Sequence, residues 1–151
     1  MHISAKVDYA VRTLVEIAGA ESTPVKAEYL ATAQTIPHKF LEAVLGDLRR
    51  AGLVQSRRGP DGGYWLARPA AEIAVADVIR SVEGPLASVR GERPEEVEYD
   101  GPAKPLRDVW IAVRVNLRAV LEEVTVADIA SGALPDFVGR LTADPEAWQR
   151  R

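Results

Sequence analysis

Residues 35–68 read TIPHKFLEAVLGDLRRAGLVQSRRGPDGGYWLAR, and this stretch decides the fold. Pro37 suits the first turn of a helix, because the N–H that it lacks would have no partner there. A helix is predicted over 37–51, since apolar residues recur in it at three- and four-residue steps. That apolar stripe contains Phe40, Leu41, Val44, Leu45 and Leu48. Two short strands, 53–58 and 64–68, are predicted on either side of the glycine-rich reversal GPDGG, which makes a hairpin.

The flanking residues add helices on both sides of this stretch. A helix over 4–19, capped by Ser4, is predicted from one apolar face with helical spacing. That face contains Val7, Ala10, Val11, Leu14, Ile17 and Ala18. Shorter helices are predicted over 26–33, with Leu30 and Ala31 on its inner side, and over 75–83. The order helix, helix-turn-helix, hairpin is that of a winged helix-turn-helix DNA-binding domain, which we assign to residues 1–84.

The C-terminal half is predicted to hold a loop and a long helix. Residues 85–105 form an acidic loop that contains Glu92, Glu95, Glu96, Glu98 and Asp100. A helix over 106–124 is predicted to follow, because its apolar residues recur at alternating steps of four and three residues, as in a dimerisation seam. The seam contains Leu106, Trp110, Val113, Leu117, Val120 and Val124. We predict a dimerisation helix region over 106–132 and a patternless tail over 133–151, so the fold class is mainly α with a small β-hairpin.

Composition and charge exclude several classes of protein. The 151 residues include no cysteine, which excludes disulfides, cysteine nucleophiles and thiolate-bound clusters. No apolar stretch approaches the length of a membrane span, and the N-terminus lacks a signal-peptide core, so we expect a cytoplasmic protein. The net charge is −3 overall. Residues 1–69 carry nine basic and seven acidic residues, a net +2, so the DNA-binding surface is expected in this half.

The predicted recognition helix and wing carry side chains suited to DNA. On the exposed early turns of helix 37–51 we expect His38, Lys39 and Glu42, where lysine can meet phosphate or guanine and glutamate can accept from cytosine. Arg57 and Arg58 precede the hairpin tip, and an arginine on a narrow loop can enter the minor groove. Gly59 lets the backbone turn beside them.

Each of these residues also has an ordinary structural interpretation. Arg57 and Arg58 can be solvated strand residues, and His38 an ordinary surface histidine. The GPDGG loop is not a P-loop, because no Lys-Ser or Lys-Thr follows it. The acidic loop can bind a hard cation or remain a solvated loop, and it lacks EF-hand spacing. Trp110 and Tyr9 can line an apolar pocket between the long helix and the DNA-binding domain, or can be used in core packing and the dimer seam.

The run from TIPHKFLEAVLGDLRR to RRGPDGGYWLAR and IAVADVIRSVEG resembles the signature of the Rrf2 family of bacterial winged helix-turn-helix regulators. The opening SAKVDYAVRTLVEIA resembles the family's first helix, so the likeness covers residues 1–84 closely. The resemblance implies a dimer joined through the long helix. It also implies DNA-reading residues at His38, Lys39 and Glu42, and a minor-groove arginine at Arg58, next to Gly59.

One departure from the family pattern affects sensing. Many members carry three cysteines in the loop before the long helix, and these hold an iron–sulfur cluster. The loop 85–105 has none, and Asp8 and Arg12 of the first helix cannot replace the missing thiolates. The sequence therefore identifies a member without the cluster cysteines, for which we expect no cofactor and no metal site.

The predicted function is a sequence-specific DNA-binding transcriptional regulator, a repressor that binds a palindromic operator as a homodimer. Its expected partners are double-stranded DNA, a second copy of the chain and an unidentified small-molecule or protein effector, with no membrane. An adaptor that keeps the fold without DNA affinity is the alternative. An enzyme is disfavoured, because the sequence has no nucleophile elbow, paired-histidine metal motif or nucleotide loop.

Overall fold

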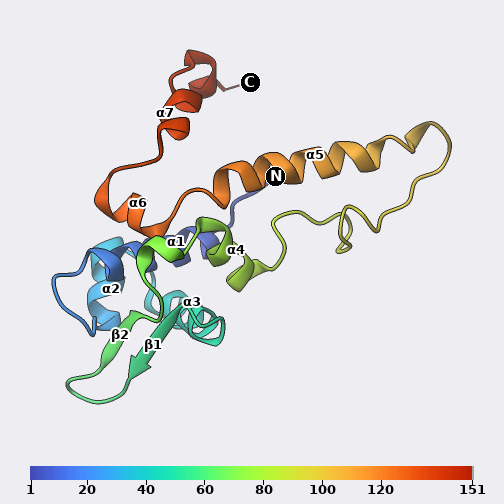
Figure 1. The fold of residues 1–151 in the computed structure, drawn as a ribbon. Helices are drawn as coiled ribbons and strands as arrows, with labels where there is room; N and C mark the ends of the chain where they lie inside the picture. The colour runs from blue at the N-terminus through green and yellow to red at the C-terminus, as the bar shows by residue number, and fades with distance from the viewer. Residues whose placement is uncertain (151) are drawn as a thin grey trace.

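The computed structural model describes residues 1–150, in which a helical head carries a projecting hairpin below and a long helical arm above (Figure 1). The helices of the head are α1 (Ala5–Gly19), α2 (Ala27–Gln34), α3 (His38–Arg50), α4 (Val75–Glu83) and α6 (Val126–Ser131). The arm is α5 (Leu106–Leu121), and α7 (Asp136–Thr142) follows near the C-terminus. The strands are β1 (Val54–Arg57) and β2 (Gly63–Leu66), and the 3-10 turns are η1 (Ala70–Glu72), η2 (Gly101–Ala103) and η3 (Pro145–Trp148).

Helix α1 is the centre of the head, and most of its predicted apolar face is buried, with Val11 and Ala18 partly buried. Ser4 caps it, since its Oγ accepts a hydrogen bond of 3.2 Å from the N–H of Val7. Ala10 and Leu14 have no exposed surface. Helices α2, α3, α4 and α6 all pack against α1. The core of the head is therefore built around this first helix.

Helices α2 and α3 form the helix-turn-helix. Leu30 of α2 and Leu41 of α3 are fully buried. The turn between the helices is sharp because Thr35 takes the left-handed conformation at φ 51° and ψ 48°. Pro37 lies at the N-cap of α3 and not inside it, so the helix begins one residue after the predicted start. Phe40 was predicted in the apolar stripe but is 59% exposed; its ring lies tilted beside that of Tyr9, with centroids 6.2 Å apart.

The hairpin pairs β1 with β2 antiparallel, from Val54 opposite Leu66 to Arg57 opposite Gly63. Its base is extended by the segment before α2, because Val25 and Tyr64 exchange two backbone hydrogen bonds of 2.8 Å. The hairpin is thus joined to the start of the helix-turn-helix, which fixes its direction relative to α3.

The acidic connection 85–105 is not a loose loop. It runs back along α5 (Figure 1), and its Pro94 and Val97 are buried. Glu95 forms an ion pair with Arg114 of α5, and Trp110 donates a 3.0 Å hydrogen bond to the hydroxyl of Tyr99. Trp110 and Tyr9 therefore do not share a pocket, because Tyr9 packs beside Phe40.

The long helix ends earlier than its heptad spacing predicts. α5 stops at Leu121, and Val124 lies beyond it with 8% exposure, buried within its own chain. The N–H of Val75 donates to the carbonyl of Val124, and the N–H of Val126 donates to the carbonyl of Ile73, both at 2.9 Å. Val124 is therefore not part of a continuous seam, and the prediction that it belongs to one is wrong.

The C-terminal residues also differ from the prediction. α6 packs on α1 and η1 and so belongs to the head, not to an extension of the dimerisation helix. Both α4 and α6 begin with Val-Ala-Asp, and in each the aspartate, Asp77 or Asp128, accepts a hydrogen bond from the N-cap N–H. The tail, predicted to be patternless, forms α7 and η3; Arg151 lies outside the described residues. Among residues 1–150 no helix is long and apolar enough to cross a membrane.

Candidate nucleic-acid interface

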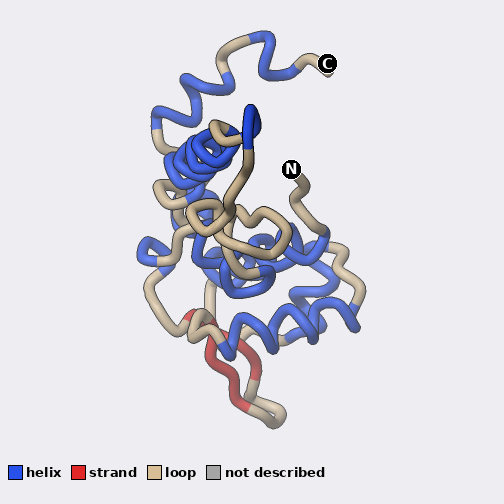
Figure 2. Tube along the Cα trace, turned by 90° about the vertical axis from the view of Figure 1, so that its right-hand side faces the viewer, coloured by secondary structure: helices blue, strands red, loops and turns tan. Residues whose placement is uncertain are grey.

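The hairpin and α3 form the end of the molecule opposite α7. Figure 2 shows the hairpin extending beyond all the helices, with the C-terminus at the other end. Figure 1 shows α3 beside β1. A helix that lies next to a projecting ribbon can enter a major groove while the ribbon reaches an adjacent groove.

The start of α3 presents the three predicted DNA-reading side chains. His38, Lys39 and Glu42 are all exposed. The Nδ1 atom of His38 lies 3.4 Å from a carboxylate oxygen of Glu42, one turn along the helix. The side chain of Lys39 forms no hydrogen bond or ion pair with any residue in 1–150. The structure therefore brings the three together on one exposed turn, with the lysine free to meet an external partner.

The two wing arginines have different environments, although both are exposed. The guanidinium of Arg57 donates a 3.0 Å hydrogen bond to the carbonyl of Asp61, across the hairpin tip. Arg58 makes no contact of this kind within residues 1–150. Arg57 therefore closes the tip, and Arg58 is the arginine available for a ligand outside the chain.

A lysine that sequence reasoning missed supports the wing. The Nζ atom of Lys26, just before α2, donates to the carbonyls of Gly59 at 3.1 Å and Pro60 at 2.7 Å. Because 33 or more residues separate these groups, no local pattern predicts the contact. Lys26 joins the first helix of the pair to the hairpin tip and places its own positive charge there.

Two glycines make the tip geometry possible. A Cβ atom on Gly62 would lie 2.0 Å from the carbonyl oxygen of Arg57, and one on Gly63 would lie 2.6 Å from the carbonyl oxygen of Val25. Both distances are far shorter than a van der Waals contact, so only glycine fits. Gly59, at φ 101°, needs its left-handed conformation instead, since open space surrounds its Cα.

The basic residues of the head with ion pairs and those without them lie on different parts of its surface. Among its nine Lys and Arg residues at 1–69, four form ion pairs inside the described chain: Lys6, Arg12, Arg50 and Arg68. The other five form none there, and all lie on α3, the wing or the residue before α2. They are Lys26, Lys39, Arg49, Arg57 and Arg58. Cations without internal ion pairs on one projecting surface are typical of phosphate recognition.

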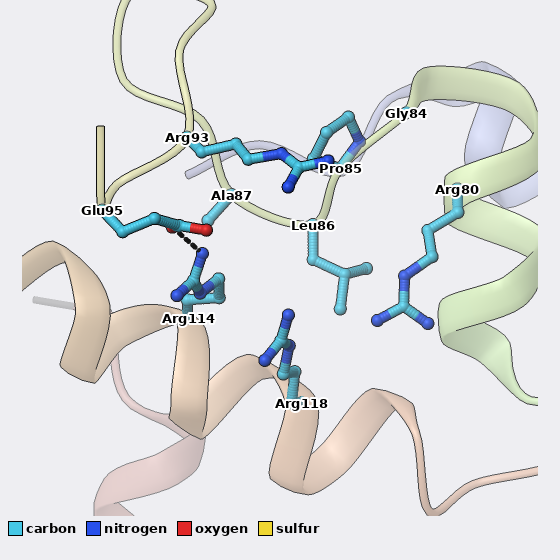
Figure 3. A pocket seen from close by; sticks show the side chains of 9 residues that line it. All are labelled: Arg80, Gly84, Pro85, Leu86, Ala87, Arg93, Glu95, Arg114 and Arg118. Atoms are coloured by element: carbon cyan, nitrogen blue, oxygen red, sulfur yellow. Dashed lines mark hydrogen bonds and ion pairs between the residues drawn. The ribbon is translucent and has the colours of Figure 1, made fainter. Parts of the chain in front are cut away.

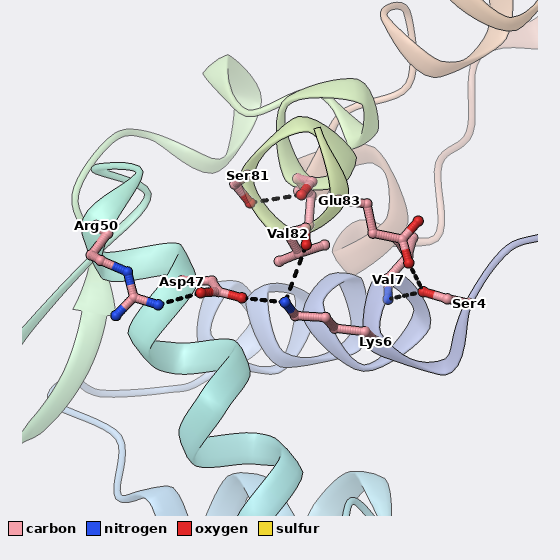
Figure 4. Close-up of polar contacts among 9 residues, drawn as sticks. Ser4, Lys6, Val7, Asp47, Arg50, Ser81, Val82 and Glu83 are labelled. Atoms are coloured by element: carbon pink, nitrogen blue, oxygen red, sulfur yellow. Dashed lines mark hydrogen bonds and ion pairs between the residues drawn. The ribbon is translucent and has the colours of Figure 1, made fainter. Parts of the chain in front are cut away.

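Helix α3 is held in position by a polar contact at its other end (Figure 4). Lys6 of α1 lies 2.6 Å from a carboxylate oxygen of Asp47 and also donates to the carbonyl of Val82 at 3.1 Å. Arg50 pairs with the same carboxylate. The hydrogen bond from Lys6 is the main cause that lowers the pKa of Asp47 below its ordinary 3.8. The group ties α3 to α1 and α4, and the sequence pattern did not indicate it.

Comparison with known proteins agrees with this geometry. The family model Rrf2, described as an iron-dependent transcriptional regulator, matches residues 3–132. The HTH-type transcriptional regulator Rv1287 of Mycobacterium tuberculosis is 52% identical over 150 residues, covering 99% of this chain and 93% of that protein. The HTH-type regulator CymR of Bacillus subtilis is 36% identical over 132 residues, covering 87% and 91%.

Solved structures give the same result. The structure of CymR, the global cysteine regulator of B. subtilis, matches with a TM-score of 0.73 at 34% identity, covering 87% of this chain and 97% of that one. The IscR structure from T. potens matches with a TM-score of 0.68 at 30% identity, covering 100% and 93%. These names describe transcriptional regulators and not enzymes. With its winged helix fold and its match over residues 3–132, the chain belongs to the Rrf2 family of DNA-binding transcriptional regulators.

Proposed function

We propose that the protein is a cytoplasmic repressor that binds a palindromic operator as a homodimer, through α3 and the wing. The observation that carries this proposal is the set of five cations without internal ion pairs on the projecting surface of the head. A surface of this kind gains affinity by releasing counterions from phosphates, and a second copy doubles the number of contacts. Repression is the commoner mode that the family resemblance implies.

Sequence reading is assigned to the start of α3. Lys39 is suited to the edge of a guanine or to a phosphate, and Glu42 accepts from the amino group of a cytosine. The contact of Glu42 with His38 holds the carboxylate over the first turn of the helix. Glu42 is therefore the residue that selects a base, while Lys39 contributes mainly affinity.

The wing is assigned to the minor groove. Arg58 is the unpaired arginine at the tip, and a narrow minor groove concentrates negative potential that attracts such a side chain. Arg57 and Lys26 act differently, since both donate to carbonyls of the tip and keep its shape. Arg58 thus enters the minor groove, and Arg57 and Lys26 hold the hairpin tip in the shape that places Arg58 there.

The arm supports assembly of two copies. No side chain of α5 is buried in the single chain, and Val109, Val113 and Val115 are 50%, 38% and 56% exposed. The accessible surface of the chain is 9826 Å², against about 7,500 Å² for a compact monomer of the same mass. An apolar groove of about 270 Å³, lined in part by Ile3, Leu117 and Val120, continues this surface. A second α5 is a suitable cover for it.

The donor set does not fit an iron or iron–sulfur site, although the family description mentions iron. The chain has no cysteine, and residues 1–150 contain no group of three histidine, aspartate or glutamate side chains placed to hold a metal. Where the cluster cysteines of other members are expected, Glu95 and Tyr99 instead contact α5. We therefore propose a signal other than a cluster.

The test is selection of operators from random duplexes, followed by binding measurements across a salt series. We expect an inverted repeat whose half-sites are separated by about 10–10.5 base pairs or a multiple of this spacing. Recovery of single asymmetric sites would contradict the symmetric dimer. An adaptor without DNA affinity would show no salt-dependent shift of any duplex.

Two further measurements refine the assignment. Glu42→Ala is expected to relax base choice at one position in each half-site, by roughly 1–3 kcal/mol of discrimination, with little loss of affinity. A reporter placed behind the selected operator is expected to rise in expression when the regulator is deleted. A fall in expression would show an activator instead.

A further inference from the structure

A pocket between the head and the arm is lined by four arginines. It has a volume of about 360 Å³ and lies between α4, the first residues of the acidic connection and α5 (Figure 3). The arginines come from three separate segments, and their guanidinium groups point into the same space around Leu86. They are Arg80, Arg93, Arg114 and Arg118. No local pattern predicts this cluster, because its members are spread over 39 positions of the chain.

The carboxylates around the pocket do not balance these charges. Glu95 pairs with Arg114, and Glu122 pairs with both Arg80 and Arg118. Asp77 lies 3.8 Å from Arg80 but is shared with Arg68 at 3.6 Å. No other ion pair reaches these arginines within residues 1–150. Asp77 and Arg68 offset each other, so Glu95 and Glu122 alone face the four arginines of the pocket, which leaves an excess of two positive charges.

Arg114 is the most enclosed of the four, and one of its donors is unused. Its side chain is 17% exposed, and its Nε atom is buried without a hydrogen-bond partner among residues 1–150. Leaving a buried donor on a charged group unpaired is costly, so native structures generally supply an acceptor. Arg93 forms no ion pair within the described residues, although its charge acts on nearby Glu95. Both arginines therefore have guanidinium N–H donors that are available to bind an anion.

We propose that this pocket binds a small organic dianion, with acidic groups of the carboxylate or phosphoryl class. Guanidinium groups match the planar oxygens of these groups with paired hydrogen bonds, and an excess of two charges matches a dianion. Pro85, Leu86 and Ala87 give the pocket an apolar wall suited to a short carbon skeleton. DNA is a poor candidate, because the pocket lies on the arm side of the head and the hairpin lies on the other side.

The bound anion would join two parts of the molecule. Arg80 belongs to α4 of the head, and Arg114 and Arg118 belong to α5 of the arm. Few other contacts link α4 with α5. A ligand held by both sets fixes the angle between head and arm, and so sets the separation of two heads in a dimer. This regulatory part depends on the proposed function, whereas anion binding does not.

The first experiment measures anion binding without DNA. The whole chain is heated with increasing inorganic phosphate or succinate, and with acetate at the same ionic strength. We expect saturable rises of about 5–10 °C in Tm at roughly a hundredfold excess over Kd for at least one dianion, and none for acetate. A response to phosphate alone identifies a phosphoryl ligand, and a response to succinate alone identifies a dicarboxylate.

Variants then test the site. Arg118→Gln, whose side chain is 48% exposed, and Arg114→Gln are each expected to lose the saturable rise. Arg107→Gln, on the same helix but outside the pocket, is expected to keep it. No saturable response to either dianion, an equal response to acetate, or full retention of the response in Arg118→Gln would overturn the proposal.

The second experiment measures operator affinity with and without the active dianion. A change of about 5–150-fold in Kd is expected for the unmodified chain, and no change for Arg118→Gln. Unchanged operator affinity beside intact anion binding would overturn the regulatory link alone. Absence of DNA binding in the ligand-free chain would instead count against the proposed function.

Discussion

The replacement Arg58→Ala distinguishes a wing that contacts DNA from a hairpin that is merely solvated. Arg58 makes no hydrogen bond or ion pair within residues 1–150, so its removal leaves no broken internal contact. The fold and its stability should therefore stay unchanged, within about 0.5 kcal/mol. Any loss of DNA affinity in this variant then reports on the complex and not on folding.

The expected size of the change follows from the number of cations without internal ion pairs. Five per protomer give about ten contacts in a symmetric dimer, and each neutralised phosphate contributes about −0.9 to the slope of log K against log salt. The slope of the unmodified protein should then approach about −9, and loss of one arginine in each protomer should reduce it to about −7. The variant should also lose any preference for A·T-rich flanks, because Arg58 is assigned to a narrow minor groove.

The assay is fluorescence anisotropy with a selected operator at several salt concentrations. Arg140→Ala is the matched control, since it removes the same charge from α7, at the end of the molecule away from the hairpin. We expect the control to keep the affinity and slope of the unmodified protein. If Arg58→Ala and Arg140→Ala give the same affinity and the same slope, the wing does not contact DNA and the reasoning fails.

Three other changes test the rest of the structure. Gly62→Ala should cost at least tenfold in operator affinity while circular dichroism shows an intact helical core, because its Cβ would lie 2.0 Å from the carbonyl oxygen of Arg57; unchanged affinity would contradict the tip geometry. Asp47→Asn should lower the free energy of unfolding by about 1–2 kcal/mol at pH 7. The ionised carboxylate stabilises the fold fully above its unfolded pKa of 3.8 and loses this effect as the pH falls through its lowered folded pKa, so urea titrations should show the gap closing in that range. Charged replacements at Leu117 and Val120 should give monomers or aggregates by light scattering, and a monomeric unmodified chain at micromolar concentration would refute the dimer.

The head was predictable because its signal is local. Leu14, Leu41 and Leu48 lie at helical spacing and are fully buried, and the glycines between the strands mark a hairpin. Phe40 was misplaced for a physical reason: it adjoins Leu41, and two adjacent helical positions point about 100° apart. Val124 was misplaced because the four-three spacing of apolar residues continues past Leu121, where the helix has already ended.

The candidate site was predictable only in its exposed parts. His38, Lys39 and Glu42 lie on the early turns of the predicted helix, and Arg58 adjoins the glycine of the tip. Their roles on DNA stay predictions. Lys26 depends on two segments that meet in space, which no spacing rule reports. Pro94 and Val97 are buried in the acidic connection, but they do not belong to any periodic apolar pattern. The packing of this connection could therefore not be predicted from the sequence either.

The paired backbone contact between Ala74 and Thr125 has a mechanical consequence. It fastens the chain just beyond the C-terminal end of α5 to the head, so that the arm resembles a lever whose pivot lies at this bridge. At 16 residues, α5 is about 24 Å long. Tilting it by about 5° about the pivot moves its far end by about 2 Å, comparable with the helix shifts by which other proteins switch. A small change beside the pivot is thereby amplified at the end where α5 begins.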